Sequence, residues 1–384
     1  MPSNAANPHF STVNRKSKIA NSTVLVLRFS ALGDVAMSAT VVRAFALAYP
    51  NHRFIMASAP LPEPLFAGIP NLRFEGINTK AYEGVWGIFR LYGRLRRLRP
   101  TIVLDLHQVV RTHLLCTLFF LLGATPVFGV KKLRRRRYLL TRAKRKRLQP
   151  LPSMIDKYID VFVRSGFPPI SVDATLLPAA IHLCSTRSVS RSPSDILRSS
   201  STLPPPTPPE WRQAGFLIGI APFAKHPTKE WSVKKMEGVV EQLSLSGKYR
   251  IFLFGGGALE RAILKRWEQR YANTICVAGA TDFTGELSLI GNMHLFVSMD
   301  SANMHLASFM GVPALSIWGG THPYAGFYGW RQAPENAIQI DMPCRPCSVY
   351  GRKSCRIGTL ACLQSISVEG VLQRIENFFA PQTS

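Results

Sequence analysis

The stretch of this sequence that decides the fold is Val24-Leu25-Val26-Leu27-Arg28-Phe29-Ser30-Ala31-Leu32-Gly33-Asp34. Its first four residues form an aliphatic run that predicts a buried β-strand, and a helix-like segment from Val35 to Tyr49 follows. Between them, Gly33 indicates a tight turn. This order places Asp34 at a helix N-terminus, on the rim where open α/β sheets bind ligands. A carboxylate there is either a helix cap or a catalytic base.

Strand-like runs alternate with helix-length segments along the chain of 384 residues, which is the pattern of βαβ units and parallel sheets. The predicted strands are 24–27, 54–57 and 102–106 in the first half, and 216–221, 249–254, 274–277, 295–299 and 313–318 in the second. Between the halves, residues 185–209 contain eight Ser and six Pro, a composition typical of an exposed linker.

The chain therefore divides into four parts. We expect a disordered N-terminal extension at 1–22, an α/β domain at 23–184, a linker at 185–213 and a second α/β domain at 214–384. Two α/β domains joined by a linker imply a cleft between them.

Small, polar or charged residues follow six of the predicted strands. They are Gly33-Asp34, Asp105-Leu106-His107, Pro222-Phe223-Ala224-Lys225, Gly255-Gly256-Gly257, Asp300-Ser301-Ala302 and Gly319-Gly320-Thr321. Because a doubly wound sheet binds its ligand at the carboxyl ends of its strands, these residues predict a nucleotide or sugar site between the domains.

The second half offers the best phosphate site. Lys225, His226 and Lys229 surround a loop that enters a helix, and the turn at Asp300 could present helix amides to an anion. The alternative is ordinary capping by Asp300 or Ser301 beside solvated lysines.

The glycine run at 255–257 is followed by Glu260, which could accept hydrogen bonds from a ribose. The alternative is a glycine-rich turn with an acidic first helical turn. The chain lacks G-x-G-x-x-G after its first strand and lacks G-x-x-x-x-G-K-[ST], which argues against a nicotinamide dehydrogenase and a P-loop NTPase.

Together these residues carry a resemblance to a known family. The segment Arg28 to Asp34 resembles the opening motif of glycosyltransferase family 9, the lipopolysaccharide heptosyltransferases. Lys229-Glu230-Trp231 resembles the K-x-W segment of that family, and Asp300 to Ala307 is similar to its D-[ST]-G-x-x-H-x-A motif, with Ala302 in place of the glycine. The similarity runs from about Thr23 to about Phe379, excluding the linker.

The resemblance implies a GT-B fold, in which two Rossmann-like domains face each other across a cleft. It implies an inverting transfer, without a cofactor or catalytic metal, from a nucleotide sugar, typically ADP-heptose, to a lipid A-Kdo type inner-core acceptor. Alternatives are a transferase of another surface polysaccharide, a non-catalytic nucleotide-sugar-binding paralogue and a sugar epimerase.

The same resemblance suggests roles for particular residues. Asp34 would be the catalytic base. The donor side would comprise Lys229 and the amides after Asp300 at the diphosphate, Asp300 with Ser301 and Ala302 at sugar hydroxyls, His305 near the donor, and Glu260 at the ribose or base. His107 and Arg111 would lie near the acceptor, although His107 could equally be a structural loop histidine.

Four of the seven cysteines cluster late in the chain with the spacing C-x2-C-x7-C-x6-C. They are Cys344, Cys347, Cys355 and Cys362. A structural zinc site is the leading interpretation, and disulfides or free packed thiols are the alternatives. We assign none of the four to catalysis.

The chain carries 47 Lys+Arg against 22 Asp+Glu, a net charge of +25 that favours an anionic partner. Residues 131–147 hold eleven Lys or Arg and no acid. Residues 84–98 predict an amphipathic helix with an apolar stripe opposite a basic face; the stripe is Trp86, Ile88, Phe89, Tyr92 and Leu95, and the face is Arg90, Arg94 and Arg97. Such segments lie on anionic membranes, although most charge runs are solvated surface.

We expect a cytoplasmic protein, peripheral on the inner membrane face. The start of the chain lacks the apolar segment of a signal peptide. The longest apolar stretch, residues 114–122, is too short to span a bilayer and predicts a buried helix. Nucleic acid is not expected as a partner, because no RRM, KH, helix-turn-helix or finger pattern is present.

Overall fold

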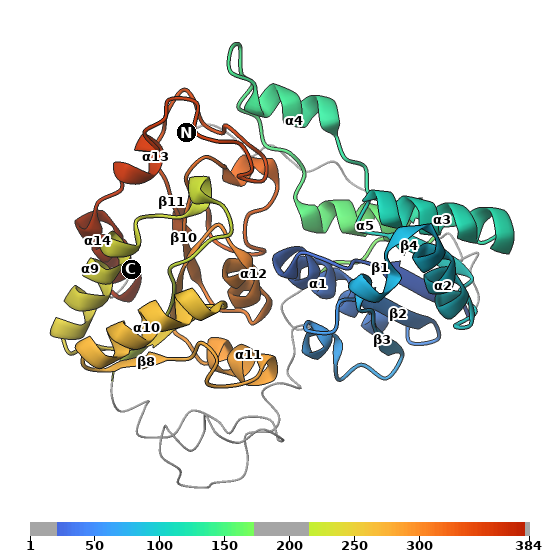
Figure 1. Cartoon of the computed structure of the whole chain (residues 1–384), viewed down its shortest axis with the longest axis horizontal. Helices are drawn as coiled ribbons and strands as arrows, with labels where there is room; N and C mark the ends of the chain where they lie inside the picture. Colours follow the sequence, from blue (N-terminus) through green and yellow to red (C-terminus); the bar gives the residue numbers. More distant parts are fainter. Residues whose placement is uncertain (1–20, 173–214, 381–384) are drawn as a thin grey trace, which may run out of the picture.

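The computed structural model describes residues 21–172 and 215–380, which form two α/β domains side by side (Figure 1). Each domain is built on a parallel sheet covered by helices on both faces. The expected GT-B arrangement is therefore confirmed. The proposed extension at 1–22 lies almost wholly outside the described residues and the linker at 185–213 entirely so, and both stay predictions.

The N-terminal sheet has five parallel strands in the order β3-β2-β1-β4-β5. The strands are β1 (Thr23–Leu27), β2 (Arg53–Ser58), β3 (Leu72–Gly76), β4 (Ile102–Asp105) and β5 (Val127–Gly129). The order reverses between β1 and β4, so the loops after these two strands flank the switch point where doubly wound sheets bind ligands.

The C-terminal sheet repeats this plan with a sixth strand, in the order β8-β7-β6-β9-β10-β11. Its strands are β6 (Phe216–Ala221), β7 (Tyr249–Leu253), β8 (Thr274–Cys276), β9 (Leu295–Met299), β10 (Ala314–Ile317) and β11 (Ala337–Ile338). Its switch point lies between β6 and β9, which pair in parallel with Ala221 opposite Ser298.

Helices cover both faces of each sheet. In the N-terminal domain α1 (Leu32–Ala48) and α5 (Met154–Arg164) pack on one face, and α2 (Gly84–Arg96) and α3 (Val110–Gly123) pack on the other. In the C-terminal domain α11 (Phe283–Gly291) and α12 (Ala302–Phe309) cover one face, and α9 (Val233–Leu245), α10 (Ala258–Arg270) and α14 (Val368–Phe379) the other. Shorter segments are α4 (Arg134–Thr141), α13 (Ala361–Gln364) and the 3-10 turns η1 (Glu63–Phe66), η2 (Thr79–Tyr82), η4 (Pro227–Lys229), η5 (Pro323–Ala325) and η6 (Pro334–Asn336).

The two domains meet through α1 and α12, which share one hydrophobic cluster with the inner faces of both sheets. Helix α1 is buried on all sides from Val35 to Ala46, since one side covers its own sheet and the other faces α12. A Cβ atom on Gly33 would lie 2.7 Å from Cδ2 of His305 and 3.2 Å from Cα of Ala302. Gly33 therefore sits inside α1 and permits this close approach, rather than making the predicted turn.

Helix α3 departs from its predicted burial, and α2 leaves part of its apolar stripe exposed. The predicted helix at 114–122 is confirmed as part of α3, but its predicted burial is wrong in part, because Leu114, Phe120, Leu121 and Leu122 are exposed. The helix predicted at 84–98 is present as α2, where Tyr92 and Leu95 of the apolar stripe are buried and Trp86 and Phe89 are exposed. Within 21–172 and 215–380, no helix has the length and apolar character needed to cross a membrane.

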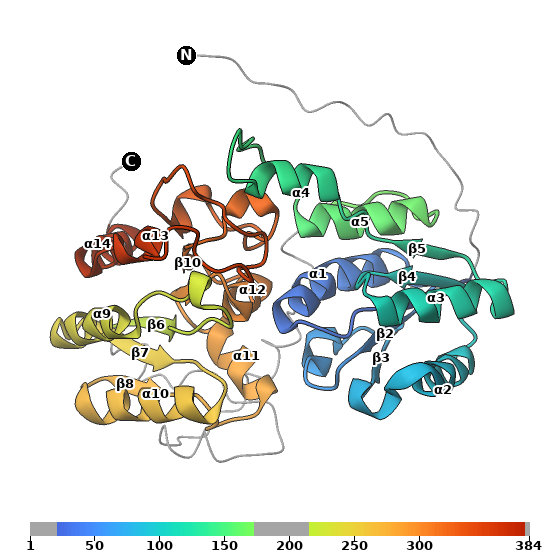
Figure 2. The same cartoon turned by 45° about the horizontal axis from the view of Figure 1, so that its top comes forward.

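Helix α4, which carries part of the basic run, reaches across to the C-terminal domain (Figure 2). Arg137 donates to the hydroxyl of Tyr350 at 2.5 Å, and Lys146 donates to the carbonyl of Pro346 at 3.1 Å. From the opposite side, Arg356 donates to the carbonyl of Thr141 at 2.5 Å. Part of the run at 131–147 thus bridges the domains rather than forming a free surface.

Candidate functional site

A cavity of about 970 Å³ lies between the two domains, where the carboxyl ends of both sheets face each other. Residues singled out in the sequence line it, among them Asp34, Lys225, His226, Lys229, Glu260, Asp300, Ser301, Ala302 and His305. The two sheets bring them together because their loops follow β1, β6, β7 and β9, the strands at or next to the two switch points.

Asp34 lies in the first turn of α1 but does not cap that helix. The N-cap residue is Ala31, which offers no side-chain hydrogen bond, so the capping alternative for Asp34 is wrong. Its Oδ2 instead forms an ion pair with Arg28, whose side chain is buried. The second guanidinium nitrogen of Arg28 donates to the carbonyl of Leu106 at 2.7 Å. Arg28 thus fixes the carboxylate at the cavity wall.

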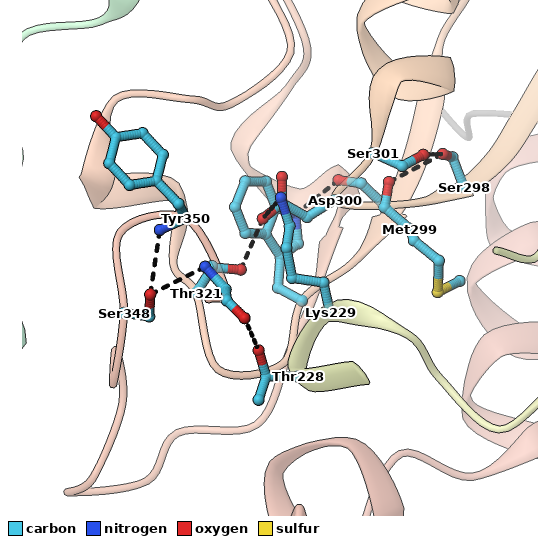
Figure 3. Close-up of polar contacts among 12 residues, drawn as sticks. Thr228, Lys229, Ser298, Met299, Asp300, Ser301, Thr321, Ser348 and Tyr350 are labelled. Carbon is cyan, nitrogen blue, oxygen red and sulfur yellow. Dashed lines mark hydrogen bonds and ion pairs between the residues drawn. The ribbon is translucent and has the colours of Figure 1, made fainter. Parts of the chain in front are cut away.

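Across the cavity, Lys229 and Asp300 form an ion pair with 2.9 Å between Nζ and Oδ2 (Figure 3). Thr321 donates its hydroxyl to the same Oδ2 at 2.7 Å. Asp300 is almost completely buried, whereas Lys229 is partly exposed to the cavity. The pairing follows from the sheet, because β6 and β9 are neighbours and end at the same edge. Asp300 therefore holds the ammonium group of Lys229 at the cavity wall.

The N-terminus of α12 faces the cavity through Ala302 and Asn303. Ser301 occupies the N-cap position but makes no capping hydrogen bond, and its hydroxyl lies 3.2 Å from that of Ser298 (Figure 3). The alternative of ordinary capping by Asp300 or Ser301 is therefore wrong. The first turn of α12 presents amide groups and the positive end of the helix dipole to the cavity beside Lys229.

His305 lies on α12 and is buried against Gly33 of α1. Its Nδ1 atom has no hydrogen-bond partner among the described residues. Burial lowers the pKa of His305 to about 4, although Asp300 and Asp34 oppose the shift. The imidazole is therefore neutral near pH 7, and it places an unpaired nitrogen next to both domains.

Glu260 lines the cavity but already has a partner. Its Oε2 accepts a hydrogen bond from the backbone N–H of Gly256 at 2.6 Å, which closes the glycine turn before α10. This contact is the structural alternative that the sequence left open. The prediction that Glu260 binds the ribose or base stays a prediction, carried by its position on the cavity wall.

His107 and Arg111 do not line the cavity; both belong to the N-terminal domain, in the loop after β4 and in the first turn of α3. His107 Nε2 is 3.3 Å from the hydroxyl of Ser30, in the loop that leads to Asp34. Burial, with the positive charges of Arg28 and Arg111 nearby, lowers the pKa of His107 to about 3. The backbone N–H groups of His107 and Gln108 donate to Asp105, which holds the loop between β4 and α3 in place.

The cavity wall also includes Glu286, Tyr350 and Arg352, which belong to no motif that the sequence analysis identified. Glu286 lies in α11, and burial raises its pKa to about 7. Tyr350 and Arg352 come from the loop between the clustered cysteines. Their approach to the cavity depends on contacts more than a hundred residues apart, including the hydroxyl of Thr228, which donates to the carbonyl of Gly351 at 2.7 Å.

The four clustered cysteines line one small space beside Thr228 and Gly320. All four are free thiols, and Cys347 Sγ donates to the carbonyl of Cys344 at 3.1 Å. In the part of the chain that the structure describes, no group of three or more His, Cys, Asp and Glu side chains is arranged to hold a metal ion. The arrangement thus gives the zinc interpretation no support, and zinc stays a prediction. The cysteine loop supports the site, because its Gly351 carbonyl binds the hydroxyl of Thr228 and Thr228 directly precedes Lys229.

Comparison with known proteins agrees with this geometry. The profile of glycosyltransferase family 9 (heptosyltransferase) matches residues 88–356, more than half of the chain. The chain belongs to glycosyltransferase family 9.

Relatives within family 9 are distant in sequence. Lipooligosaccharide heptosyltransferase 2 of Haemophilus influenzae is 23% identical over 324 residues, which cover 78% of this chain and 84% of that protein. Lipooligosaccharide heptosyltransferase 2 of Campylobacter jejuni is 23% identical over 43% of this chain, and the chain spans about half of its length (52%). The structure of Escherichia coli ADP-heptose lipopolysaccharide heptosyltransferase II superposes with a TM-score of 0.60 at 18% identity, covering 93% of this chain and 98% of that one. This last likeness establishes the shared fold.

Proposed function

We propose that this family 9 protein is an inverting heptosyltransferase of lipopolysaccharide core synthesis, with ADP-heptose as donor and a lipid A-Kdo type saccharide as acceptor. The observation that carries the proposal is the placement of Asp34 on one wall of the interdomain cavity and of Lys229 with the α12 N-terminus on the other. The donor assignment also draws on the relatives, which are named heptosyltransferases, and on the Escherichia coli structure, which is named for ADP-heptose.

Asp34 acts as the general base in this reaction. The acceptor hydroxyl transfers its proton to the carboxylate as its oxygen attacks the anomeric carbon of the donor. The bond from that carbon to the phosphate oxygen breaks on the opposite face, so the configuration inverts and ADP leaves. Arg28 occupies Oδ2 of Asp34, which leaves Oδ1 for the acceptor hydroxyl.

The leaving diphosphate gains negative charge, and the C-terminal domain supplies the opposite charge. The ammonium of Lys229 is held in place by Asp300, so it pays little conformational entropy on binding the donor. The amides at the start of α12 point to the same region and act without reorganisation. The reaction as proposed requires no cofactor or catalytic metal, because these groups provide the stabilising field.

His107 and Arg111 belong to the acceptor side of the proposal. His107 lies beside Ser30 in the domain that carries the base, and Arg111 follows in the first turn of α3. A saccharide bearing acidic groups would meet Arg111 there, together with the excess of basic side chains in this domain. The anionic inner membrane surface, where such an acceptor is anchored, is the proposed second partner.

A donor screen tests this function. ADP-heptose and common UDP-, GDP- and TDP-sugars are compared by nucleotide release, with and without a lipid A-Kdo acceptor. We expect acceptor-dependent nucleotide release only with ADP-heptose as the donor. Equal turnover of a different nucleotide sugar would indicate a transferase of another surface polysaccharide, and binding without turnover would indicate a non-catalytic paralogue.

Asp34→Asn tests the base. The change keeps the size of the side chain but removes its proton affinity, so transfer falls by at least about a hundredfold while the donor still binds. Asp282→Asn is the matched control, because Asp282 lines the same cavity and caps α11, a role that Asn also performs. Full activity in the Asp34 variant would remove Asp34 from the base role.

A further inference from the structure

Helices α2 and α3 form a surface layer on the side of the N-terminal domain that points away from the C-terminal domain (Figures 1 and 2). Their inner sides share one hydrophobic cluster with the sheet. The rings of Tyr92 and Phe119 lie 5.0 Å apart between centroids, and a Cβ on Gly123 would lie 3.6 Å from the hydroxyl of Tyr92. The C-terminal halves of the two helices are therefore adjacent, and their N-terminal halves both lie at the ligand-binding edge of the sheet.

The outer side of this layer is apolar where solvent-facing helices are normally polar. Trp86 is 82% exposed, Val110 75%, Leu121 68% and Phe120 64%. We use the name α2–α3 face for the exposed apolar side chains on these two helices: Val85, Trp86, Phe89, Val110, Leu114, Phe120, Leu121 and Leu122. Exposed apolar side chains gathered on two adjacent helices mark an interaction site.

Most charges around the α2–α3 face are positive, although Glu83, directly before α2, is an exposed acid. Neither helix contains Asp or Glu. Arg90 and Arg96 are exposed on α2, Arg97 and Arg99 are exposed just beyond it, and Arg111 is half-buried in the first turn of α3. A second copy of the chain on this face would bring like charges together, whereas an anionic bilayer offers both an apolar interior and opposite charge.

We infer that the α2–α3 face docks on an anionic bilayer, with its apolar side chains entering the interface and its arginines contacting lipid phosphates. The N-terminal ends of both helices lie at the same edge of the sheet as Asp34, so docking here presents the cleft to an acceptor that is held in the same leaflet. This deepens the proposed function by naming its membrane contact. It also differs from docking through the run at 131–147, part of which contacts the C-terminal domain.

The test measures binding of the full chain to vesicles of phosphatidylcholine with phosphatidylglycerol, compared with phosphatidylcholine alone. Trp86→Ser combined with Phe120→Ser should weaken binding by at least about tenfold, because each change removes a large apolar contact from the interface. The matched control is Leu245→Ser with Leu259→Ser, since both leucines are equally exposed but lie in the C-terminal domain. This control should bind like the wild type.

Brominated lipids give a second readout of the same docking. Trp86 should be quenched by them in the wild type, and Trp86→Phe should lose that quenching while retaining binding. Equal vesicle binding by the Ser variants and the wild type would overturn the inference. So would a wild-type dimer, seen by sedimentation, that the Ser variants dissociate without any change in vesicle binding.

The readouts separate this inference from the proposed function. ADP release with a detergent-dispersed acceptor should be unchanged in the Ser variants, because neither residue touches the cavity. Vesicle binding that depends on the α2–α3 face without any transferase activity would overturn the proposed function alone. Activity with vesicle binding that ignores the face would overturn this inference alone.

Discussion

Gly33→Ala probes the contact that closes the cleft. The added Cβ would lie 2.7 Å from Cδ2 of His305 and 3.2 Å from Cα of Ala302, against 3.4–4 Å for an ordinary van der Waals contact. The ring of His305 is buried and has little space to move, and the second clash is with backbone. Either α12 must move away from α1 or the start of α1 must shift, and both changes alter the cavity.

The cost follows from the size of the clash. Overpacking a close-packed interior by one methyl group costs about 1–3 kcal/mol. Alanine is a better helix former than glycine and returns up to roughly 1 kcal/mol of this. The expected net loss of stability is therefore on the order of 1–2 kcal/mol, or a fall of about 2–8 °C in the Tm of a domain of this size.

The assay is thermal unfolding together with turnover and small-angle X-ray scattering. We expect a lower Tm, a larger radius of gyration and at least about tenfold slower transfer, since a displacement near 1 Å disturbs the reacting geometry. Gly93→Ala is the matched control, because Gly93 lies in α2 with open space around it and should become slightly more stable. Identical behaviour of the two variants would refute a tight contact between α1 and α12.

Three other substitutions and one metal measurement test separate parts of the molecule. Lys229→Met should weaken ADP binding by about tenfold or more in calorimetry, because a charged hydrogen bond to phosphate is lost; unchanged affinity would place the phosphate site elsewhere. Arg28→Met should lower kcat by roughly tenfold with an unchanged KM for the donor, since Asp34 loses its anchor; an unaffected kcat would contradict that role. Burial holds the pKa of His305 at about 4, against an ordinary value of 6.5, so the unfolded chain takes up the proton first as pH falls. Stability should therefore drop by about 3 kcal/mol between pH 6.5 and pH 4, and His305→Asn should flatten this part of the urea-midpoint profile; parallel profiles would contradict it. Zinc measured in protein purified without chelator should be near one ion per chain if the four clustered cysteines bind it, and substoichiometric metal with two disulfides would end that interpretation.

The central strands were predictable because they are fully buried and therefore continuously apolar. β1, β2, β6, β7 and β9 lie within a residue or so of their predicted positions. The strands missed are β3, β5 and β11. They lie at sheet edges, and β3 and β5 are only partly buried, so their sequences lack a clear apolar run.

Helix α3 shows the limit of the same reasoning. Its run of leucine and phenylalanine predicted burial on all sides, but composition does not reveal what covers a helix. In the tertiary structure α3 forms an outer layer, and half of its apolar side chains face outward. The segment that was predicted to lie in the core is instead part of the exposed apolar surface that we infer to bind a membrane.

The sequence alone determined two doubly wound sheets, their order along the chain and the position of Asp34 after the first strand. It could do so because burial of a parallel strand demands an aliphatic run and ligand loops follow the carboxyl ends. Only the tertiary structure decided that Asp34 pairs with Arg28 rather than capping α1, that Lys229 pairs with Asp300, and that Gly33 touches His305. These contacts depend on which loops the folded sheets bring together, and no local pattern in the sequence specifies which distant residues become neighbours.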